Sequence, residues 1–313
     1  MKAYTVKNDK IIEVPLDQLS KYKTTIWIRT INPSQKEIEF LAGITEAPIE
    51  EFKEFLEEDE RPRLEIQKYL QLIYRCPYTE NGEIITVPVT VFINNYMVVT
   101  IEKQKTAPLD YIEALTQEGR RRFLYRKSPM TFLTYFIDKI NDEFFAKIDK
   151  IADTVELFRE RKHGLSKEMT EKVYSLSVTL AFFNQSLLGN IEVLNHLRKA
   201  YFRMITPKDK EHVDELYHDA LQILDTEKVQ REIVANLFNL QSVITSAKLN
   251  EFIKKLTILA LVMLIPTLLS GIFGMNVPLP FAHDDPFAFY YILFFMFLIT
   301  AGSIGFFKFM KWF

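Results

Sequence analysis

Cysteine is nearly absent from this chain of 313 residues, because Cys76 is the only one. A single cysteine excludes an intramolecular disulfide and any metal site built from several cysteines. The sequence also lacks a glycine-rich phosphate loop and any recognisable Ser-His-Asp or Cys-His arrangement, so it indicates neither a nucleotide site nor an enzyme. The net charge of −2 gives no reason to expect nucleic acid as a partner. The N-terminal segment has no long apolar run, so we expect no signal peptide.

Charge is missing from two long stretches near the C-terminal end. Residues 256–275 and 287–307 contain no Asp, Glu, Lys or Arg, although charged residues make up 26% of the chain. Each stretch has about the 20 residues that a helix needs to cross hydrocarbon. A pair of buried core helices is the alternative, but two such runs so close together are rare in soluble cores. The sequence therefore predicts two transmembrane helices.

The short segment between these two stretches, residues 276–286, lacks Lys and Arg and carries Asp284 and Asp285. Lysines flank the other ends of both stretches. The positive-inside rule therefore predicts a multi-pass protein of the cell membrane with both termini in the cytoplasm and the loop outside. The last lysines are expected to contact lipid headgroups. The flanking lysines are Lys248, Lys254, Lys255, Lys308 and Lys311.

The first part of the chain alternates strand-like and helix-like segments. Residues 24–32 are β-branched and alternate in polarity, as a strand does. Ser34 can cap a helix that begins near Lys36. The pairs Asn81-Gly82 and Asn94-Asn95 are typical of hairpin turns. The pattern predicts a mixed α/β domain with further elements at 48–56 (helix), 64–75, 84–93 and 96–102 (apolar stretches).

From about Ser128 the pattern becomes helical. Apolar residues recur every three or four positions over 130–160, and a second amphipathic run covers 166–203. A third helix begins at Pro207, and no Gly or Pro interrupts it from Lys208 to Ile265. If it continues to Phe273 it is about 100 Å long at 1.5 Å per residue. A helix of that length is expected in a stalk that runs into a membrane.

The predicted fold class is therefore an α+β cytoplasmic domain joined to a long-helix stalk and two C-terminal transmembrane helices. The expected parts are an N-terminal α/β domain (1–127), an antiparallel helical pair (128–205), the stalk helix (206–255), a pore-lining transmembrane helix (256–275), an extracellular loop (276–286), a second transmembrane helix (287–307) and a basic cytoplasmic tail (308–313).

Two helices from one chain cannot enclose a water-filled path, so transport would require an oligomer in which each subunit contributes one helix to a central axis. The first span is the better candidate, because it continues the stalk helix and a cytoplasmic change can move it. Heptad-like steps from Asn250 give one face that mixes small, polar and apolar residues. The second span is bulky and aromatic, which suits contact with lipid. The members of the mixed face are Asn250, Ile253, Thr257, Ala260, Leu264, Thr267 and Gly271.

The tripeptide Gly274-Met275-Asn276 stands directly after the first apolar span and before a short loop and a last span. In this position it resembles the signature of the CorA family of magnesium channels. The stretch SAKLNEFIKKLTILALVMLIPTLLSGIFGMNVP is similar to the stalk-to-pore helix of that family throughout. The earlier segment WIRTINPSQKEIEFL and the pair Arg61-Pro62 resemble its N-terminal domain.

The resemblance implies a funnel-shaped homopentamer that passes hydrated Mg²⁺ passively, with Gly274, Met275 and Asn276 as the selectivity filter. Mg²⁺ gives up its waters reluctantly, so a ring of neutral amides can hold the hydrated ion through its water shell. Without the resemblance, Asn276 would be interpreted as a helix C-cap. Other positions that match the pore lining of the family are Asn250, Ile253, Leu256, Leu264, Thr267 and Gly271.

The resemblance also implies that cytoplasmic Mg²⁺ binds between subunits and closes the pore. Glu215 falls where relatives carry a sensing Asp, and Asp219 shares its helix face; an ordinary solvated face is the alternative. The acidic run Glu57 to Glu60 could supply a partner carboxylate from the next subunit. His212, Glu215 and Asp219 could instead hold a softer ion such as Zn²⁺ or Co²⁺.

Mg²⁺ is thus expected both as the transported ion and as the regulator, with no organic cofactor. The expected partners are other copies of the chain, membrane lipids and divalent cations. Two alternatives stay open at this point. One is a Co²⁺, Ni²⁺ or Zn²⁺ transporter of the same superfamily, and the other is a membrane-anchored sensor or scaffold whose spans serve only as an anchor.

Overall fold

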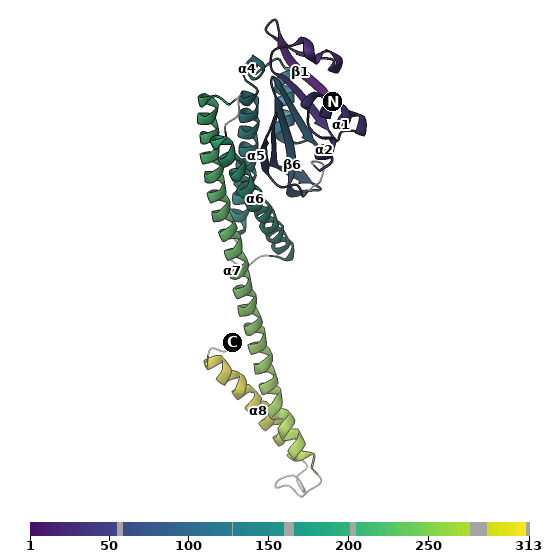
Figure 1. Cartoon of the computed structure of the whole chain (residues 1–313). Coiled ribbons are helices and arrows are strands. Elements are labelled where there is room, and N and C mark those ends of the chain that lie inside the picture. The colour runs from purple at the N-terminus through teal and green to yellow at the C-terminus, as the bar shows by residue number, and fades with distance from the viewer. Residues whose placement is uncertain (55–58, 127, 160–165, 201–204, 276–286, 311–313) are drawn as a thin grey trace. The chain divides into compact units, whose positions relative to one another are not determined.

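The computed structural model describes residues 1–54, 59–126, 128–159, 166–200, 205–275 and 287–310 (Figure 1). By its internal contacts the chain forms two compact units, Met1–Phe238 and Asn239–Phe313. The first unit contains a sheet with helices on both faces. The second contains two apolar helical segments.

The sheet has seven strands in the order β2-β1-β3-β7-β6-β5-β4. Neighbouring strands are antiparallel, except that β3 and β7 run parallel. The parallel pair lies in the middle, so its strands are covered on both faces, as parallel strands usually are. The strands are β1 (Lys2–Lys7), β2 (Lys10–Glu13), β3 (Ile26–Ile31), β4 (Arg63–Ile66), β5 (Leu70–Glu80), β6 (Glu83–Asn94) and β7 (Met97–Glu102).

Each face of the sheet belongs to a separate apolar core. One face packs under α1 (Gln35–Thr45) and α2 (Ile49–Glu54), where Phe52 stacks on Phe92 with ring centroids 4.9 Å apart. The opposite face packs against α3 (Ala107–Gln117) and the long helices α5 (Pro129–Arg159) and α6 (Lys167–Lys199). Short helical segments at Leu16–Lys21 and Phe123–Arg126 (α4) complete the unit.

The predicted turns and the predicted helix cap are confirmed. Asn81 and Gly82 both have positive φ, as does Asn95, which is the backbone conformation that tight hairpins require. Ser34 directly precedes α1. The Ser34 N–H (2.8 Å) and the Ser34 hydroxyl (2.9 Å) both donate to the carboxylate of Glu37. These bonds hold the pKa of Glu37 below its usual value.

The sequence pattern missed several elements at the edges of the domain. The hairpin of β1 and β2 and the helix α3 were not predicted. The apolar stretch 64–75 is not one element, because β4 ends at Ile66 and β5 begins at Leu70. These segments are short, and their burial depends on strands that are distant in sequence.

The three long helices were predicted correctly. The predicted helix at 130–160 is α5, the one at 166–203 is α6, and the third is α7 (Pro207–Phe273), a single helix of 67 residues. Thr206 starts α7: its hydroxyl accepts from the Asp209 N–H, and the Asp209 carboxylate accepts from the Thr206 N–H at 2.9 Å. The predicted break at His163-Gly164 lies outside the described residues.

Gly189 of α6 is the point where this helix meets the segment before β4. A Cβ built on Gly189 would lie 2.7 Å from Cγ of Pro62, so only glycine allows this approach. The contact gives a physical reason for a glycine in the middle of α6, where it faces Pro62.

Replacing Gly189 with alanine is expected to lower the free energy of unfolding by about 1–3 kcal/mol, because either α6 or Pro62 has to move. Thermal unfolding of the full chain, followed by the fluorescence of the buried Trp27, measures the change. Gly43→Ala in α1 is the matched control, because nothing lies within 4 Å of its Cβ position. Equal stability of the two variants would contradict the proposed clash.

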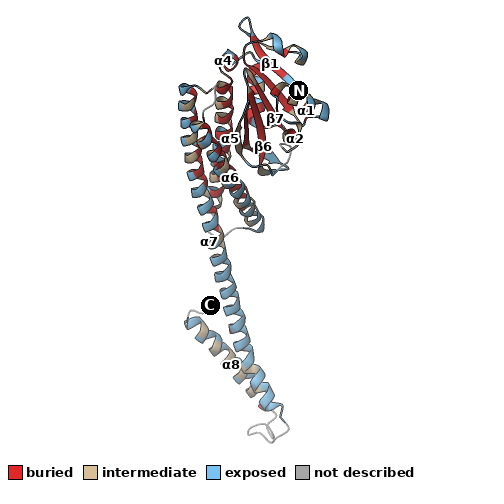
Figure 2. Cartoon of the chain, in the orientation of Figure 1, coloured by how far each residue is buried: buried red, intermediate tan, exposed pale blue. Residues whose placement is uncertain are grey.

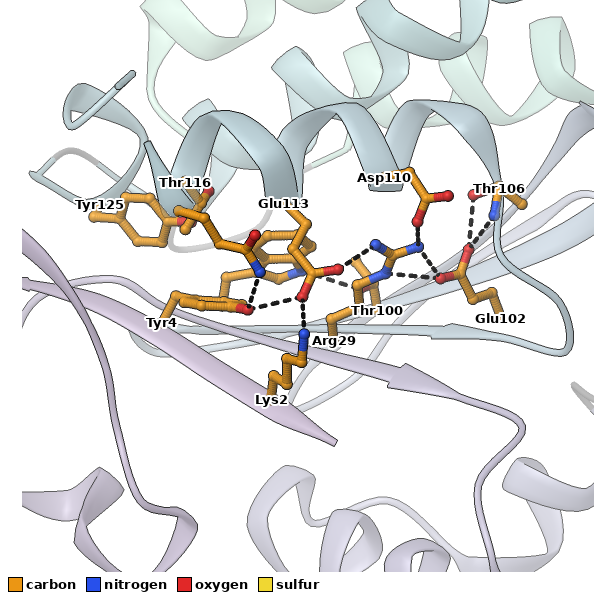
Figure 3. Close-up of polar contacts among 12 residues, drawn as sticks. Lys2, Tyr4, Arg29, Thr100, Glu102, Thr106, Asp110, Glu113, Thr116 and Tyr125 are labelled. Carbon is orange, nitrogen blue, oxygen red and sulfur yellow. Dashed lines mark hydrogen bonds and ion pairs between the residues drawn. The ribbon is translucent and has the colours of Figure 1, made fainter. Parts of the chain in front are cut away.

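A buried ionic network ties β1, β3 and β7 to α3 (Figure 3). Arg29 of β3 is 2% exposed and Glu102 of β7 is 1% exposed. The Arg29 guanidinium donates to Glu102 (2.8 Å) and to Glu113 of α3 (2.7 Å), and it lies 2.7 Å from Asp110. The other Glu102 oxygen accepts from the Thr106 N–H at 2.9 Å.

The outer end of the same network lies at Glu113. Its carboxylate accepts from Lys2 (2.9 Å) and from the Tyr4 hydroxyl (2.7 Å), both on β1. Burial alone would raise the pKa of Glu113, but these bonds and the charge of Arg29 hold it below its usual value. Every charged member of the network therefore has a partner, which is the condition for keeping charges inside a protein.

Candidate functional site

Two helical segments are long and apolar enough to cross a membrane: the C-terminal part of α7 and α8 (Ala288–Phe309). Figure 2 shows that α7 is buried on one side near its N-terminus and is exposed along most of its C-terminal part. Large apolar side chains such as Leu259, Leu268 and Phe297 are more than half exposed there. Water disfavours such a surface, and hydrocarbon accepts it.

The apolar part of α7 has two distinguishable faces. Ile258 and Val262 are buried, and Ile265 lines a small cavity together with Ile299 and Gly302 of α8. Since α8 is the other helix of this unit, this face packs against it. Thr267 lies about 180° around the helix from Ile258 at 100° per residue.

The predicted pore-lining residues are exposed in one protomer and lie mainly away from the α8 face. Leu264 differs from the others, because it also lines the cavity between α7 and α8. The Thr267 hydroxyl donates to the Met263 carbonyl at 2.8 Å, which leaves its oxygen lone pairs available to an ion or a water. The exposed members are Asn250, Ile253, Leu256, Leu264, Thr267 and Gly271.

The predicted filter begins where α7 ends. The Gly274 N–H donates to the Ser270 carbonyl at 2.9 Å, and the Met275 N–H donates to the Ile272 carbonyl at 3.2 Å. Gly274 does not adopt the left-handed conformation. A Cβ there would lie 3.1 Å from the Ser270 carbonyl oxygen, which is a tight contact. Asn276, and with it the predicted loop 276–286, lies outside the described residues.

A cavity of about 550 Å³ lies between the N-terminal parts of α5 and α7 in the first unit. Glu215 and Asp219, which were expected to share a helix face, both line it, and both are exposed. Asp138 of α5 lines the same cavity and lies 3.0 Å from Lys139. Sequence reasoning missed Asp138, because on a long amphipathic helix it looks like any other residue of the polar face.

The described residues of this cavity do not form a metal site in a single chain. Among the residues that the structure describes, no three His, Cys, Asp or Glu side chains are grouped closely enough to hold a metal ion. The alternative of a softer ion held by His212, Glu215 and Asp219 was therefore wrong for a single chain. The His212 ring instead pairs its Nδ1 with the Lys208 carbonyl oxygen at 2.9 Å.

The acidic run Glu57 to Glu60, which could supply a carboxylate to the regulatory site of the next subunit, is described only in part. Glu57 and Glu58 lie outside the described residues. The Glu60 carboxylate pairs with Arg63, so it is already neutralised within its own chain.

Comparison with known proteins decides the family. A model of the family described as CorA-like Mg²⁺ transporter protein matches residues 22–308. The chain belongs to the CorA family. Its resemblance at Gly274-Met275-Asn276 is thereby extended over nearly its whole length, and the family assignment from sequence is confirmed.

Individual proteins agree with this assignment in sequence or in fold. The cobalt/magnesium transport protein CorA of Methanocaldococcus jannaschii is 26% identical over 98% of this chain and 97% of its own length. The complete structure of the CorA magnesium transporter from that organism has a TM-score of 0.87 at 24% identity, covering 98% of this chain and 96% of its own. The full-length CmaX protein has a TM-score of 0.75 at 16% identity, covering 97% of each chain.

Membership of the CorA family confirms the predicted fold class, a mixed α/β domain followed by a long helix and two C-terminal membrane spans. The chain is a membrane transporter of this family and not an enzyme. The apolar surface of α7 and α8 is therefore the surface that contacts the membrane or other membrane helices.

Proposed function

We propose that five copies of this chain surround a central axis and that α7 of each copy lines a path for hydrated Mg²⁺. The observation that carries the proposal is the division of α7 into two faces. One face packs on α8, and the other carries Thr267 and Gly271 and is exposed in the part of a single chain that the structure describes. A ring of copies would turn this second face inward.

The chemistry of the outer mouth favours Mg²⁺. Asn276 contributes one neutral amide per copy directly after the end of α7. Amide oxygens can accept hydrogen bonds from the inner-shell waters of the ion, whereas a ring of carboxylates would bind the ion more tightly and slow its release. Gly274 and Met275 lead the chain from the helix to this collar.

Farther along α7, toward its N-terminal end, Ile253 and Leu256 would form an apolar constriction that closes by losing its water. Asn250 would add a second polar ring beside it. All three side chains are exposed in one protomer, as residues that face a pore or another copy must be. The lysines that flank the spans support cytoplasmic termini, so the negative potential inside the cell would drive Mg²⁺ inward through an open pore.

Closure by cytoplasmic Mg²⁺ is the proposed regulation. Glu215 and Asp219 have no ion-pair partner among the described residues, and they line a cavity with Asp138. Too few ligands gather in one protomer, so a carboxylate of a neighbouring copy would complete the site. Carboxylates brought together in this way repel one another when the ion leaves, which separates the subunits at low Mg²⁺.

Co²⁺ is a second candidate for the transported ion, because the relative from Methanocaldococcus jannaschii is named a cobalt/magnesium transport protein. Both ions carry a hydration shell of similar size, so an amide collar would not separate them sharply. Uptake of Mg²⁺, Co²⁺ and Zn²⁺ into liposomes that contain the full chain tests the proposal directly. Influx of Mg²⁺ that stops as internal Mg²⁺ rises supports it, and liposomes that stay impermeable to all three ions would leave only the anchored sensor or scaffold.

Replacing Glu215 with glutamine is expected to raise the internal Mg²⁺ needed to halve the influx by roughly five- to tenfold, a usual strength of coupling between two sites. Influx at zero internal Mg²⁺ should not change. Glu211→Gln is the control, because Glu211 is exposed on the same helix one turn earlier and does not line the cavity. A closing curve that is the same in both variants would show that Glu215 is only part of a solvated face.

A further inference from the structure

One carboxylate of α7 is buried in the first unit and belongs neither to the cavity nor to the pore face. Glu227 is 0% exposed. One of its oxygens accepts a hydrogen bond from the side-chain amide of Asn184 on α6 at 2.8 Å. The other accepts from Nε of Arg231, one turn farther along α7, at 3.1 Å.

The helix that holds Glu227 is itself fixed to the sheet. The Asn190 side chain of α6 accepts from the Arg75 N–H and donates to the Arg75 carbonyl, both at 2.9 Å, so it satisfies both backbone polar groups of this residue of β5. The hydroxyl oxygens of Ser186 on α6 and Thr86 on β6 are 2.7 Å apart and share a hydrogen bond. A short series of polar contacts, buried or partly buried, thus leads from the sheet through α6 to α7.

A second polar contact between α6 and α7 is of a different kind. Arg198 donates to Asp214 at 2.9 Å, and Asp214 is about half exposed. Exposed ion pairs are screened by water and salt and contribute little. The Glu227 carboxylate itself is fully buried, although Arg231 is about half exposed, so we expect the loss of the Glu227 charge to weaken the attachment more than the loss of the Asp214 charge.

We propose that Glu227 is a positioning residue for gating, which holds α7 on α6 so that the state of the N-terminal domain is passed along α7. The inference rests on the proposed function, because it assumes that a cytoplasmic signal closes the pore. The same helix continues without interruption to Phe273, so a change in how it is held near Glu227 can reach the apolar segment.

Burial raises the pKa of Glu227, and the Asn184 hydrogen bond together with the charges of Arg231 and Lys228 acts against that rise. These two cations lie on α7 itself, and α6 contributes the neutral amide of Asn184. Glu227 therefore takes up a proton at a higher pH than an ordinary glutamate. Protonation would break the ion pair with Arg231 and weaken the attachment to α6.

The test compares closure of the full-length protein in liposomes. Glu227→Gln is expected to raise the internal Mg²⁺ that halves the influx by roughly tenfold, whereas influx at zero internal Mg²⁺ stays the same. Asn184→Ala should give a similar shift, and the double variant should add little to either. Asp225→Asn is the matched control, because it removes an exposed carboxylate two residues away. A shift of equal size in the control, or none in Glu227→Gln, would overturn the proposal.

A pH profile separates positioning from a merely structural role. As the pH is lowered from neutral, the closing curve of the wild type should approach that of Glu227→Gln, since both then carry an uncharged residue 227. Curves that stay equally far apart at every pH would contradict the inference.

Failure of the proposed function has a distinct outcome. If the wild type conducts no Mg²⁺, hydrogen exchange on the full chain still tests the attachment. Glu227→Gln should then exchange faster than the wild type in α7 around residue 227 and in α6 around residue 184, and unchanged exchange would refute the role of Glu227.

Discussion

Alanine in place of Asn276 is expected to abolish Mg²⁺ influx while the oligomer still assembles. The proposed collar holds the ion only through amide oxygens that accept from its waters, and alanine offers no acceptor. Mg²⁺ keeps its inner-shell waters, and in this variant those waters would find no hydrogen-bond acceptor from residue 276 at the mouth of the pore. Subunit contacts along α7 should be unaffected, because they are made by the helix and the substitution lies beyond its end at Phe273.

The measurement is Mg²⁺ uptake into liposomes, combined with the mass of the detergent-solubilised oligomer. Asn239→Ala is the control, since Asn239 is an exposed asparagine of α7 that the proposal gives no role in the pore. The variant Asn276→Asp tests whether the neutral amide itself is needed or whether any polar side chain is sufficient. If the amide is needed, this variant should bind Mg²⁺ more tightly and conduct it more slowly. Wild-type influx in Asn276→Ala would mean that the filter lies elsewhere.

Replacing Arg29 with methionine is expected to destabilise the N-terminal domain by about 3–5 kcal/mol, the cost of leaving a buried charge without its partner. Arg29 serves three carboxylates, and Glu102 is its most deeply buried partner. Methionine fills a similar volume, so the loss arises from electrostatics and not from a cavity. Arg120→Met, which removes an exposed arginine beside Glu118, should change stability by less than about 1 kcal/mol.

The cost of Arg29→Met should depend on pH in a defined direction. Burial already raises the pKa of Glu102, and the loss of Arg29 would raise it further, so the penalty is largest at neutral pH. It should shrink as the pH falls through that raised pKa toward the ordinary value of 4.5. In the wild type, the stability contributed by Glu113, whose pKa is lowered, is lost only as the pH falls below 4.5.

Denaturant unfolding of the full chain, followed by the fluorescence of the buried Trp27, measures both effects. Adding Glu102→Gln to Arg29→Met should recover part of the loss, because it removes the charge that has been left unpaired. If the double variant is no more stable than the single one, and the penalty is the same at all pH values, packing rather than charge explains the role of Arg29.

Much of this protein could be read from the order of its residues. Local signals were sufficient for the cap at Ser34, the turns at Asn81-Gly82 and Asn95, and the start of α7 at Pro207, because neighbouring residues make those hydrogen bonds. The two uncharged runs were equally clear, since the cost of charge in hydrocarbon depends on composition over about 20 residues. The family followed from a tripeptide in a particular place between two spans.

Only the folded chain decided how distant residues meet. Arg29 and Glu113 are 84 positions apart, and Asn184 and Glu227 are 43 apart, so no local pattern links either pair. Asp138 lines a cavity with Glu215 because α5 and α7 lie side by side at their N-terminal ends. Sequence periodicity determined which helix faces are apolar, but the burial of one charged residue among many depends on which other segment covers it, and that is a property of the packing alone.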